Sequence, residues 1–324
     1  LRALPAPLLY LKSNPMRLAT VSHKGQAKVV AATETNRLLD LRKAAEHSGE
    51  DGTIFADMLS LINAGENGLK TARALLQSAD EDVTMAVSDV SFLPPIMPVQ
   101  YRDCLVFEEH LANCFRVMGT TMPVPPSIPP VWYDQPLYYK GNRMSFIGHG
   151  TDVQWPAYAE FLDIELELAI VVGKTGKDIS KDAAPAHIFG YSILNDVSAR
   201  DAQMREMPGQ LGPCKGKDFD TGNILGPYIL TVDEVVHPIA VNMEARVNGE
   251  RWGGGNSSQM QHSFADILAH ISSSETIYAG EVIGSGTVGT GCGLEIGKRL
   301  QDGDTFELEI ENIGILANRI VKAR

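Results

Sequence analysis

The ten residues from Phe161 to Ile170 alternate acidic and apolar side chains, and this pattern constrains the fold more than any other in the chain. On an extended strand, Asp163, Glu165 and Glu167 would share one face, with leucine and isoleucine on the other. Side chains two residues apart on a strand lie roughly 7 Å apart, so ionised carboxylates repel unless water or a cation separates them. The segment predicts either a solvated edge strand or a cation site.

Alternating acids alone are more typical of the solvated face of an edge strand. Two further carboxylates favour the cation site, however: Asp103 follows Tyr101 and Arg102, and Asp196 begins the run Asp196 to Asp201. A site built from oxygen atoms suits Mg²⁺, Ca²⁺ or Mn²⁺. We expect Asp163 to lie at the surface or at a hinge rather than to bind the ion.

Charge and cysteine content exclude several classes of protein. The net charge of −12 gives no general attraction to nucleic acid or to an anionic membrane. No apolar run approaches the roughly 20 residues that span a bilayer. The four cysteines lack CxxC spacing, which favours a reducing, cytoplasmic setting. They are Cys104, Cys114, Cys214 and Cys292. We therefore expect a soluble, cytoplasmic protein that binds neither nucleic acid nor a membrane.

The chain divides into three predicted parts. Residues 1–15 are expected to be an extension ahead of a natural start at Met16. Residues 16–95 form a small α/β N-terminal domain, with strands at 18–21 and 27–32 and helices at 54–63 and 68–78. The adjacent prolines Pro94 and Pro95 mark the junction. Residues 96–324 form the second, larger domain.

Strands dominate the larger domain. Strands are predicted at 165–172, 190–195, 224–231, 239–247, 282–284 and 305–310, with a hairpin turn at Gly303 and Asp304 before the last of them. Helices are predicted at 109–118 and at 263–272, the second opened by a serine cap. The proline-rich segment 123–130 predicts a stiff loop that could close over a pocket together with helix 109–118. This balance favours a closed or rolled β architecture.

Several separated motifs resemble the fumarylacetoacetate hydrolase family. They are Tyr101-Arg102-Asp103 with His110, the segment 162–167, Asn195-Asp196 continuing to Gln203, Gly216-Lys217-Asp218-Phe219, and Gly286-Thr287-Val288-Gly289. Their order covers about residue 99 to the C-terminus. The resemblance implies an α/β chain that is mostly β, with a β-roll catalytic domain of this family's type behind the smaller domain. It also implies a divalent cation, Mg²⁺ first and Ca²⁺ or Mn²⁺ as alternatives, and a homodimer.

The resemblance also implies roles for individual residues. The metal ligands would be Asp103, Glu165, Glu167 and Asp196. The catalytic groups would be His110 with its partner Glu295, together with Lys217 and Gln203 as donors to the reacting carbonyl. The substrate contacts would be Tyr139 and Thr287, with Arg116 as a shifted candidate for the arginine that binds a distal carboxylate. Leu105 stands where the animal enzymes have a substrate tyrosine, which weakens fumarylacetoacetate itself as the substrate.

These residues suit chemistry that builds up negative charge. A cation can chelate a 1,3-dicarbonyl, Lys217 and Gln203 can stabilise an oxyanion, and His110 can activate water. We expect a hydrolase that cleaves a carbon–carbon bond in a fumarylacetoacetate-like or acylpyruvate-type diketo acid, as in aromatic catabolism. The alternatives are an oxaloacetate-type decarboxylase, a 2-oxo acid hydratase or isomerase of the same superfamily, and a catalytically silent metal-binding scaffold.

One motif is rejected. Residues 284–289 match the dinucleotide pattern G-x-G-x-x-G, but the sequence after them predicts another turn rather than the required helix. Glycines at these positions are expected instead to let the backbone approach substrate oxygens closely.

Overall fold

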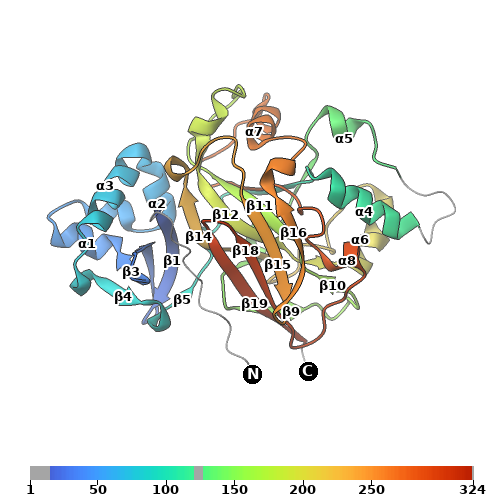
Figure 1. Ribbon diagram of the computed structural model, residues 1–324. Helices are drawn as coiled ribbons and strands as arrows, with labels where there is room; N and C mark the ends of the chain where they lie inside the picture. Colours follow the sequence, from blue (N-terminus) through green and yellow to red (C-terminus); the bar gives the residue numbers. More distant parts are fainter. Residues whose placement is uncertain (1–14, 120–126, 323–324) are drawn as a thin grey trace.

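The computed structural model describes residues 15–119 and 127–322, which fold into three sheets flanked by short helices (Figure 1). The strands are β1 Arg17–His23, β2 Gln26–Ala32, β3 Arg37–Asp40, β4 Thr84–Ala86, β5 Ser91–Phe92, β6 Tyr101–Cys104, β7 Tyr138–Lys140, β8 Phe146–Ile147, β9 Asp152–Trp155, β10 Leu162–Asp163, β11 Leu166–Val172, β12 Ile188–Asp196, β13 Ser198–Ala199, β14 Asn223–Thr231, β15 Asn242–Val247, β16 Glu250–Asn256, β17 Val282–Gly284, β18 Thr305–Ile310 and β19 Gly314–Lys322. The helices are α1 Leu41–His47, α2 Met58–Asn63, α3 Gly65–Gln77, α4 Glu108–Gly119, α5 Val131–Asp134, α6 Arg200–Glu206, α7 Phe264–Ser272 and α8 Gly293–Ile296.

The largest sheet has twelve strands, which come from both the N-terminal part and the larger part of the chain. Its main path is β4-β3-β2-β1-β14-β12-β11-β17-β6-β7, with β5 paired to β1 and β8 paired to β14. The N-terminal strands join it where β1 pairs antiparallel with β14, placing Leu18 opposite Ile229. The N-terminal part and the larger part therefore share one continuous hydrogen-bonded sheet.

A second sheet of five strands, in the order β16-β15-β18-β19-β9, belongs to the larger part. Its apolar side chains and those of β11, β12 and α7 form one buried cluster, so the main core lies between these elements. Strand β19, which was not predicted, is the last strand, and residues 311–313 connect it to β18. The predicted hairpin turn at Gly303 and Asp304 is therefore wrong, because no strand immediately precedes it.

Side-chain caps account for where α1, α2 and α7 begin. The side chain of Asp57 accepts a hydrogen bond from the backbone N–H of Ser60, so α2 begins after it and the predicted helix 54–63 is interrupted. Ser263 and Asp266 form a capping box at the start of α7, which confirms the predicted serine cap. Helices α1 to α3 pack on the N-terminal strands around a second apolar cluster.

The alternating segment does not form one solvated strand. It is divided into β10 and β11, and β11 lies between β12 and β17 with all seven of its residues buried. Asp163 is also fully buried, so its expected position at the surface is wrong. A buried central strand that carries carboxylates requires positive partners close by.

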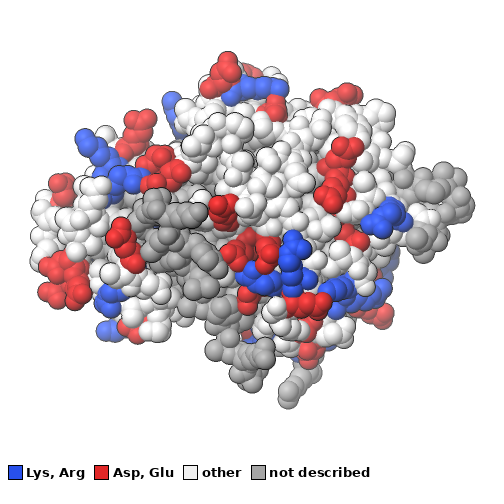
Figure 2. All heavy atoms as spheres, in the orientation of Figure 1, with Lys and Arg blue, Asp and Glu red and all other residues white. Residues whose placement is uncertain are grey.

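Three other expectations concern the proline-rich loop, membrane-spanning helices and the charge of the surface. Residues 1–14 and 120–126, the latter including part of the predicted proline-rich loop, lie outside the described residues. Within the described ranges, none of the helices has the length and apolar character needed to cross a bilayer. Figure 2 shows acidic and basic side chains interspersed on one face of the molecule. In the five-stranded sheet, Arg246 on β15 contacts Glu307 and Glu309 on β18.

Candidate active site

One pocket collects most of the residues that the sequence analysis singled out. It has a volume of about 540 Å³ and lies where α4, α6 and α8 meet the ends of β6, β11 and β12. Its inner end is polar, and its remaining wall is largely apolar. The apolar residues include Leu105, Leu111, Phe115, Met204, Met207 and Leu294. Such a pocket can hold a small acid with its charged end inward and a carbon chain against the apolar wall.

The register of the large sheet brings three carboxylates together at the inner end. Asp103 on β6 and Glu167 on β11 are separated by β17, whose Gly284 is paired with Asp103 on one side and Ala169 on the other. A Cβ at Gly284 would lie 2.2 Å from Oδ1 of Asp103 and 2.8 Å from Oε2 of Glu167. Glycine is therefore required at this position for the carboxylates to approach each other.

Asp196, at the end of β12, completes this carboxylate cluster. One oxygen from each of Asp103, Glu167 and Asp196 lies within 4.8 Å of the others, and all three side chains are buried. Oε1 of Glu167 and Oδ1 of Asp196 are buried without any hydrogen-bond partner. Burial, together with the charge of Asp196, holds the pKa of Asp103 well above its usual range, and burial together with Asp103 does the same for Glu167. Unpartnered oxygens on crowded acids fit a hard divalent cation.

Glu165, the fourth predicted ligand, faces two cations instead. Its carboxylate lies 2.5 Å from Nζ of Lys217 and 2.7 Å from Nη1 of Arg200. Burial alone would raise the pKa of Glu165, but the charges of Arg200 and Lys217 outweigh it and lower that pKa. Lys217 also lies 2.5 Å from Oδ2 of Asp196, so it links Glu165 to the carboxylate cluster.

The predicted catalytic pair is assembled as expected. Nδ1 of His110 on α4 lies 2.7 Å from Oε1 of Glu295 on α8, and both side chains are buried. The other oxygen of Glu295 accepts hydrogen bonds from Asn113 and from the backbone N–H of Thr290. Burial would lower the pKa of His110, but contacts with Cys292 and Glu295 raise it to about 10. A raised pKa favours the protonated ring, in which Nδ1–H donates to Glu295, so the pair has the arrangement of a proton-transfer group.

Asp163 and Arg200 hold the segment that carries Glu295. Asp163 accepts hydrogen bonds from the backbone N–H groups of Gly293 and Leu294, at 2.7 and 3.0 Å. Arg200 lies 2.9 Å from the same carboxylate while its Nη1 reaches Glu165. The sequence interpretation missed this connection, because a carboxylate that binds backbone N–H groups of a distant loop leaves no local pattern.

Of the remaining predicted residues, three line the pocket and Arg116 does not. Tyr139 on β7 donates a hydrogen bond of 2.7 Å to Oδ2 of Asp196 and lines the pocket. Thr287 also lines it, and so does Gln203, whose Oε1 accepts a hydrogen bond from Arg200. Arg116 is exposed, donates to Asn113 and is not among the residues that line the pocket.

Comparison with known proteins gives one family. The family described as fumarylacetoacetate (FAA) hydrolase C-terminal matches residues 101–321. The human protein named "Oxaloacetate tautomerase FAHD2A, mitochondrial" is 34% identical over 272 residues. The match covers 84% of this chain and 82% of the length of the human protein. "Oxaloacetate tautomerase YisK" from Bacillus subtilis is 30% identical over 313 residues, covering 94% of this chain and all of its own.

A solved structure supports the same grouping. The protein described as fumarylacetoacetate hydrolase from Exiguobacterium antarcticum superposes with a TM-score of 0.72 at 29% identity, covering 95% of this chain and all of its own. The fold, the conjunction of motifs and the sequence relatives therefore agree.

Proposed function

Since the chain belongs to the fumarylacetoacetate (FAA) hydrolase family, we propose that it is a divalent-metal-dependent enzyme that interconverts the enol and keto forms of a small 2-oxo acid such as oxaloacetate. The observation that carries this proposal is that His110, whose imidazole is paired with the buried carboxylate of Glu295, lines the same pocket as a cluster of carboxylates with unpartnered oxygens. It replaces hydrolysis as the first choice, because both curated relatives named above are oxaloacetate tautomerases.

Asp103, Glu167 and Asp196 would hold the cation, with Glu165 as the fourth ligand only after it exchanges its contacts with Lys217 and Arg200. A divalent ion bound there supplies a Lewis acid for the oxygen of the 2-oxo group, which stabilises negative charge on that oxygen. Mg²⁺ is the first candidate, since all the donors are hard oxygen atoms.

The residues of the chain supply the proton transfer. In ketonisation, the His110 imidazolium donates its proton to the substrate carbon next to the 2-oxo group, and the proton of the enol hydroxyl restores the imidazolium. Glu295 stabilises the positive charge on the ring between these events. Lys217, Tyr139 and Thr287 line the pocket and would orient the carboxylate and oxygen atoms of the substrate. The apolar wall excludes water from the reacting carbon.

The direct test follows the ultraviolet absorbance of the oxaloacetate enol after it is added to buffer. We expect faster loss with enzyme and Mg²⁺ than with Mg²⁺ alone, no enhancement in chelator, and a loss of roughly 10² to 10⁴ in the enzymatic rate for His110→Asn. The matched control is His47→Asn, because His47 is an exposed histidine on α1. Undiminished acceleration in chelator or in His110→Asn would refute the proposal.

Hydrolysis of a carbon–carbon bond in an acylpyruvate-type or fumarylacetoacetate-like acid is the second candidate. The observation that favours it is the volume of about 540 Å³ with an apolar outer wall, since this exceeds the needs of a four-carbon acid. The same assay with acylpyruvates, followed by detection of pyruvate, distinguishes the two. Release of pyruvate and CO₂ from oxaloacetate would instead identify a decarboxylase.

A further inference from the structure

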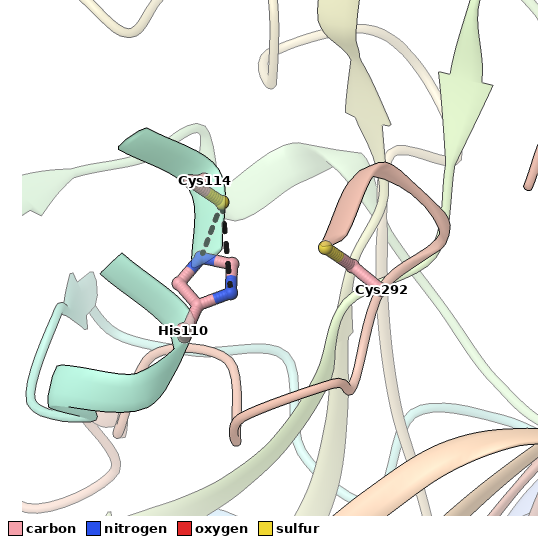
Figure 3. Close-up of side chains that lie close together, drawn as sticks. All are labelled: His110, Cys114 and Cys292. Carbon is pink, nitrogen blue, oxygen red and sulfur yellow. Dashed lines mark hydrogen bonds between the residues drawn. The ribbon is translucent and has the colours of Figure 1, made fainter. Parts of the chain in front are cut away.

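A second group of potential metal ligands lies beside the carboxylate cluster and differs from it in chemistry. His110 and Cys114 are four residues apart on α4, so their side chains share one face of the helix. Cys292, immediately before α8, points toward them from the facing segment (Figure 3). All three side chains are buried.

The distances suit a tetrahedral centre after small adjustments. Sγ of Cys114 lies 3.8 Å from Nε2 and 3.9 Å from Nδ1 of His110, and the ligand atoms of His110, Cys114 and Cys292 all lie within 4.8 Å of one another. Zinc–sulfur bonds of about 2.3 Å and zinc–nitrogen bonds of about 2.0 Å place the ligand atoms of a tetrahedral site roughly 3.5 to 4 Å apart. The movement required is therefore small.

A fourth donor is already adjacent. Oε1 of Glu295 lies 2.7 Å from Nδ1 of His110 and 3.3 Å from Sγ of Cys292. Two thiols, an imidazole and a carboxylate are a donor set that zinc binds readily in proteins, whereas Mg²⁺ has little affinity for sulfur. The two clusters would therefore select different ions.

We propose that His110, Cys114 and Cys292, with Glu295 as the fourth donor, form a second metal site for a thiophilic cation such as Zn²⁺, and that its occupation inhibits the enzyme. The bound ion takes the lone pair of a His110 ring nitrogen, so the imidazole can no longer carry a proton to substrate. Binding releases the two thiol protons, because the thiolates are the ligands, and one proton of the His110 imidazolium, because only a deprotonated ring nitrogen can bind the ion. This inference goes beyond the proposed function, and the metal site can be tested whichever reaction the enzyme catalyses.

Co²⁺ is the probe of choice, because thiolate ligands give it charge-transfer absorption in the near ultraviolet and carboxylates do not. With the carboxylate cluster saturated by Mg²⁺, the reduced wild-type protein is expected to develop this absorption at one Co²⁺ per chain, and Zn²⁺ should abolish it. Asp196→Asn should retain the band, since it alters only the carboxylate cluster. Cys114→Ser and Cys292→Ser should each lose most of it.

Cys214→Ser is the matched control, because Cys214 is an exposed thiol outside the cluster, and it should behave as wild type. A melting temperature for each variant, compared with wild type, shows whether it has folded. If a serine variant does not fold, the corresponding alanine variant replaces it. A wild-type protein without the band, or a band that persists when both cysteines are replaced, would overturn the site.

Inhibition is measured separately. Micromolar Zn²⁺ in the presence of millimolar Mg²⁺ should abolish wild-type turnover, and a zinc chelator should restore it. The Zn²⁺ concentration for half inhibition should rise at least tenfold in Cys114→Ser, with each variant compared to its own zinc-free rate. Equal sensitivity of wild type and Cys114→Ser would show that zinc inhibits elsewhere and would overturn the regulatory part of the inference.

Discussion

Nδ1 of His110 and Oε1 of Glu295 lie 2.7 Å apart although 185 positions separate the two residues in the chain. The carboxylate cannot easily turn away, because Asn113 and the N–H of Thr290 bind its second oxygen. The ring is thus oriented before substrate arrives, which lowers the cost of reaching a productive geometry.

Glu295→Gln should lower the pKa of His110 from about 10 toward its ordinary range. Because the pKa of His110 is higher in the folded than in the unfolded state, its charged ring contributes to folding stability. This contribution is complete below about pH 6.5 and is lost as the pH rises through the folded-state pKa. Nitrogen-15 NMR of the ring at pH 8 should therefore show a charged His110 in wild type and a smaller charged fraction in the variant, in which the contact with Cys292 remains. A neutral ring in wild type would contradict the proton-donor role.

Glu167→Gln and Asp196→Asn should each abolish Mg²⁺ binding in calorimetry together with turnover, because each removes a charge from the carboxylate cluster. His110→Asn should lose turnover and keep Mg²⁺ affinity. Asp182→Asn serves as the control, since Asp182 is exposed. Unchanged Mg²⁺ affinity in both acidic variants would place the ion elsewhere.

Mg²⁺ should stabilise the protein more at pH 8 than at pH 5. The folded-state pKa values of Asp103 and Glu167 are raised by burial, so folding favours their protonated forms. Stability from these groups is present at low pH and is lost as the pH rises through those values. The ion replaces the protons, so the Mg²⁺-dependent rise in Tm should grow over this range. A rise that is independent of pH would show that binding is not linked to these carboxyl groups.

Glu165→Gln separates two roles for this residue. If its main partners are Lys217 and Arg200, the variant leaves two buried cations undercompensated and should cost about 3 to 5 kcal/mol in unfolding free energy. Denaturant unfolding in chelator measures this cost without any contribution from metal. A large loss of Mg²⁺ affinity with little loss of stability would instead favour the ligand role implied by the family resemblance.

Asp163→Asn should reduce kcat through Glu295 and leave Mg²⁺ affinity unchanged. The amide still accepts one hydrogen bond from the 293–294 backbone but no longer balances Arg200, so the segment before α8 loosens. The NMR signals of the His110 ring should report this by a lowered pKa. A variant with wild-type kcat and an unchanged ring would show that the segment is held by other contacts.

The sequence located the family and most of the pocket because these features are local. Alternation around Glu165 and Glu167, the spacing of Asp103 and His110, and the run after Asp196 all survive as short motifs. Helix α4 and strands β11, β12 and β14 were likewise predicted close to their observed bounds. Hydrophobic periodicity and proline positions carry this information directly.

What the sequence could not give depends on contacts between distant segments. Nothing near Asp163 reveals that it binds the backbone before α8, and nothing near Glu165 reveals two cations facing it. Cys114 was judged by the absence of CxxC spacing, whereas its relation to His110, four residues earlier on one helix, was the informative pattern. Arg116 points away from the pocket because its register on α4 places it on the exposed face.

The pairing of β1 with β14 limits how this protein can be shortened. A truncated chain starting near residue 96 would keep every proposed catalytic side chain, yet it would uncover the backbone edge of β14 along residues that are entirely buried in the full chain. Exposed apolar edges recruit other strands, so such a fragment would tend to aggregate. We therefore expect the N-terminal strands to keep the large sheet from associating with other chains through β14.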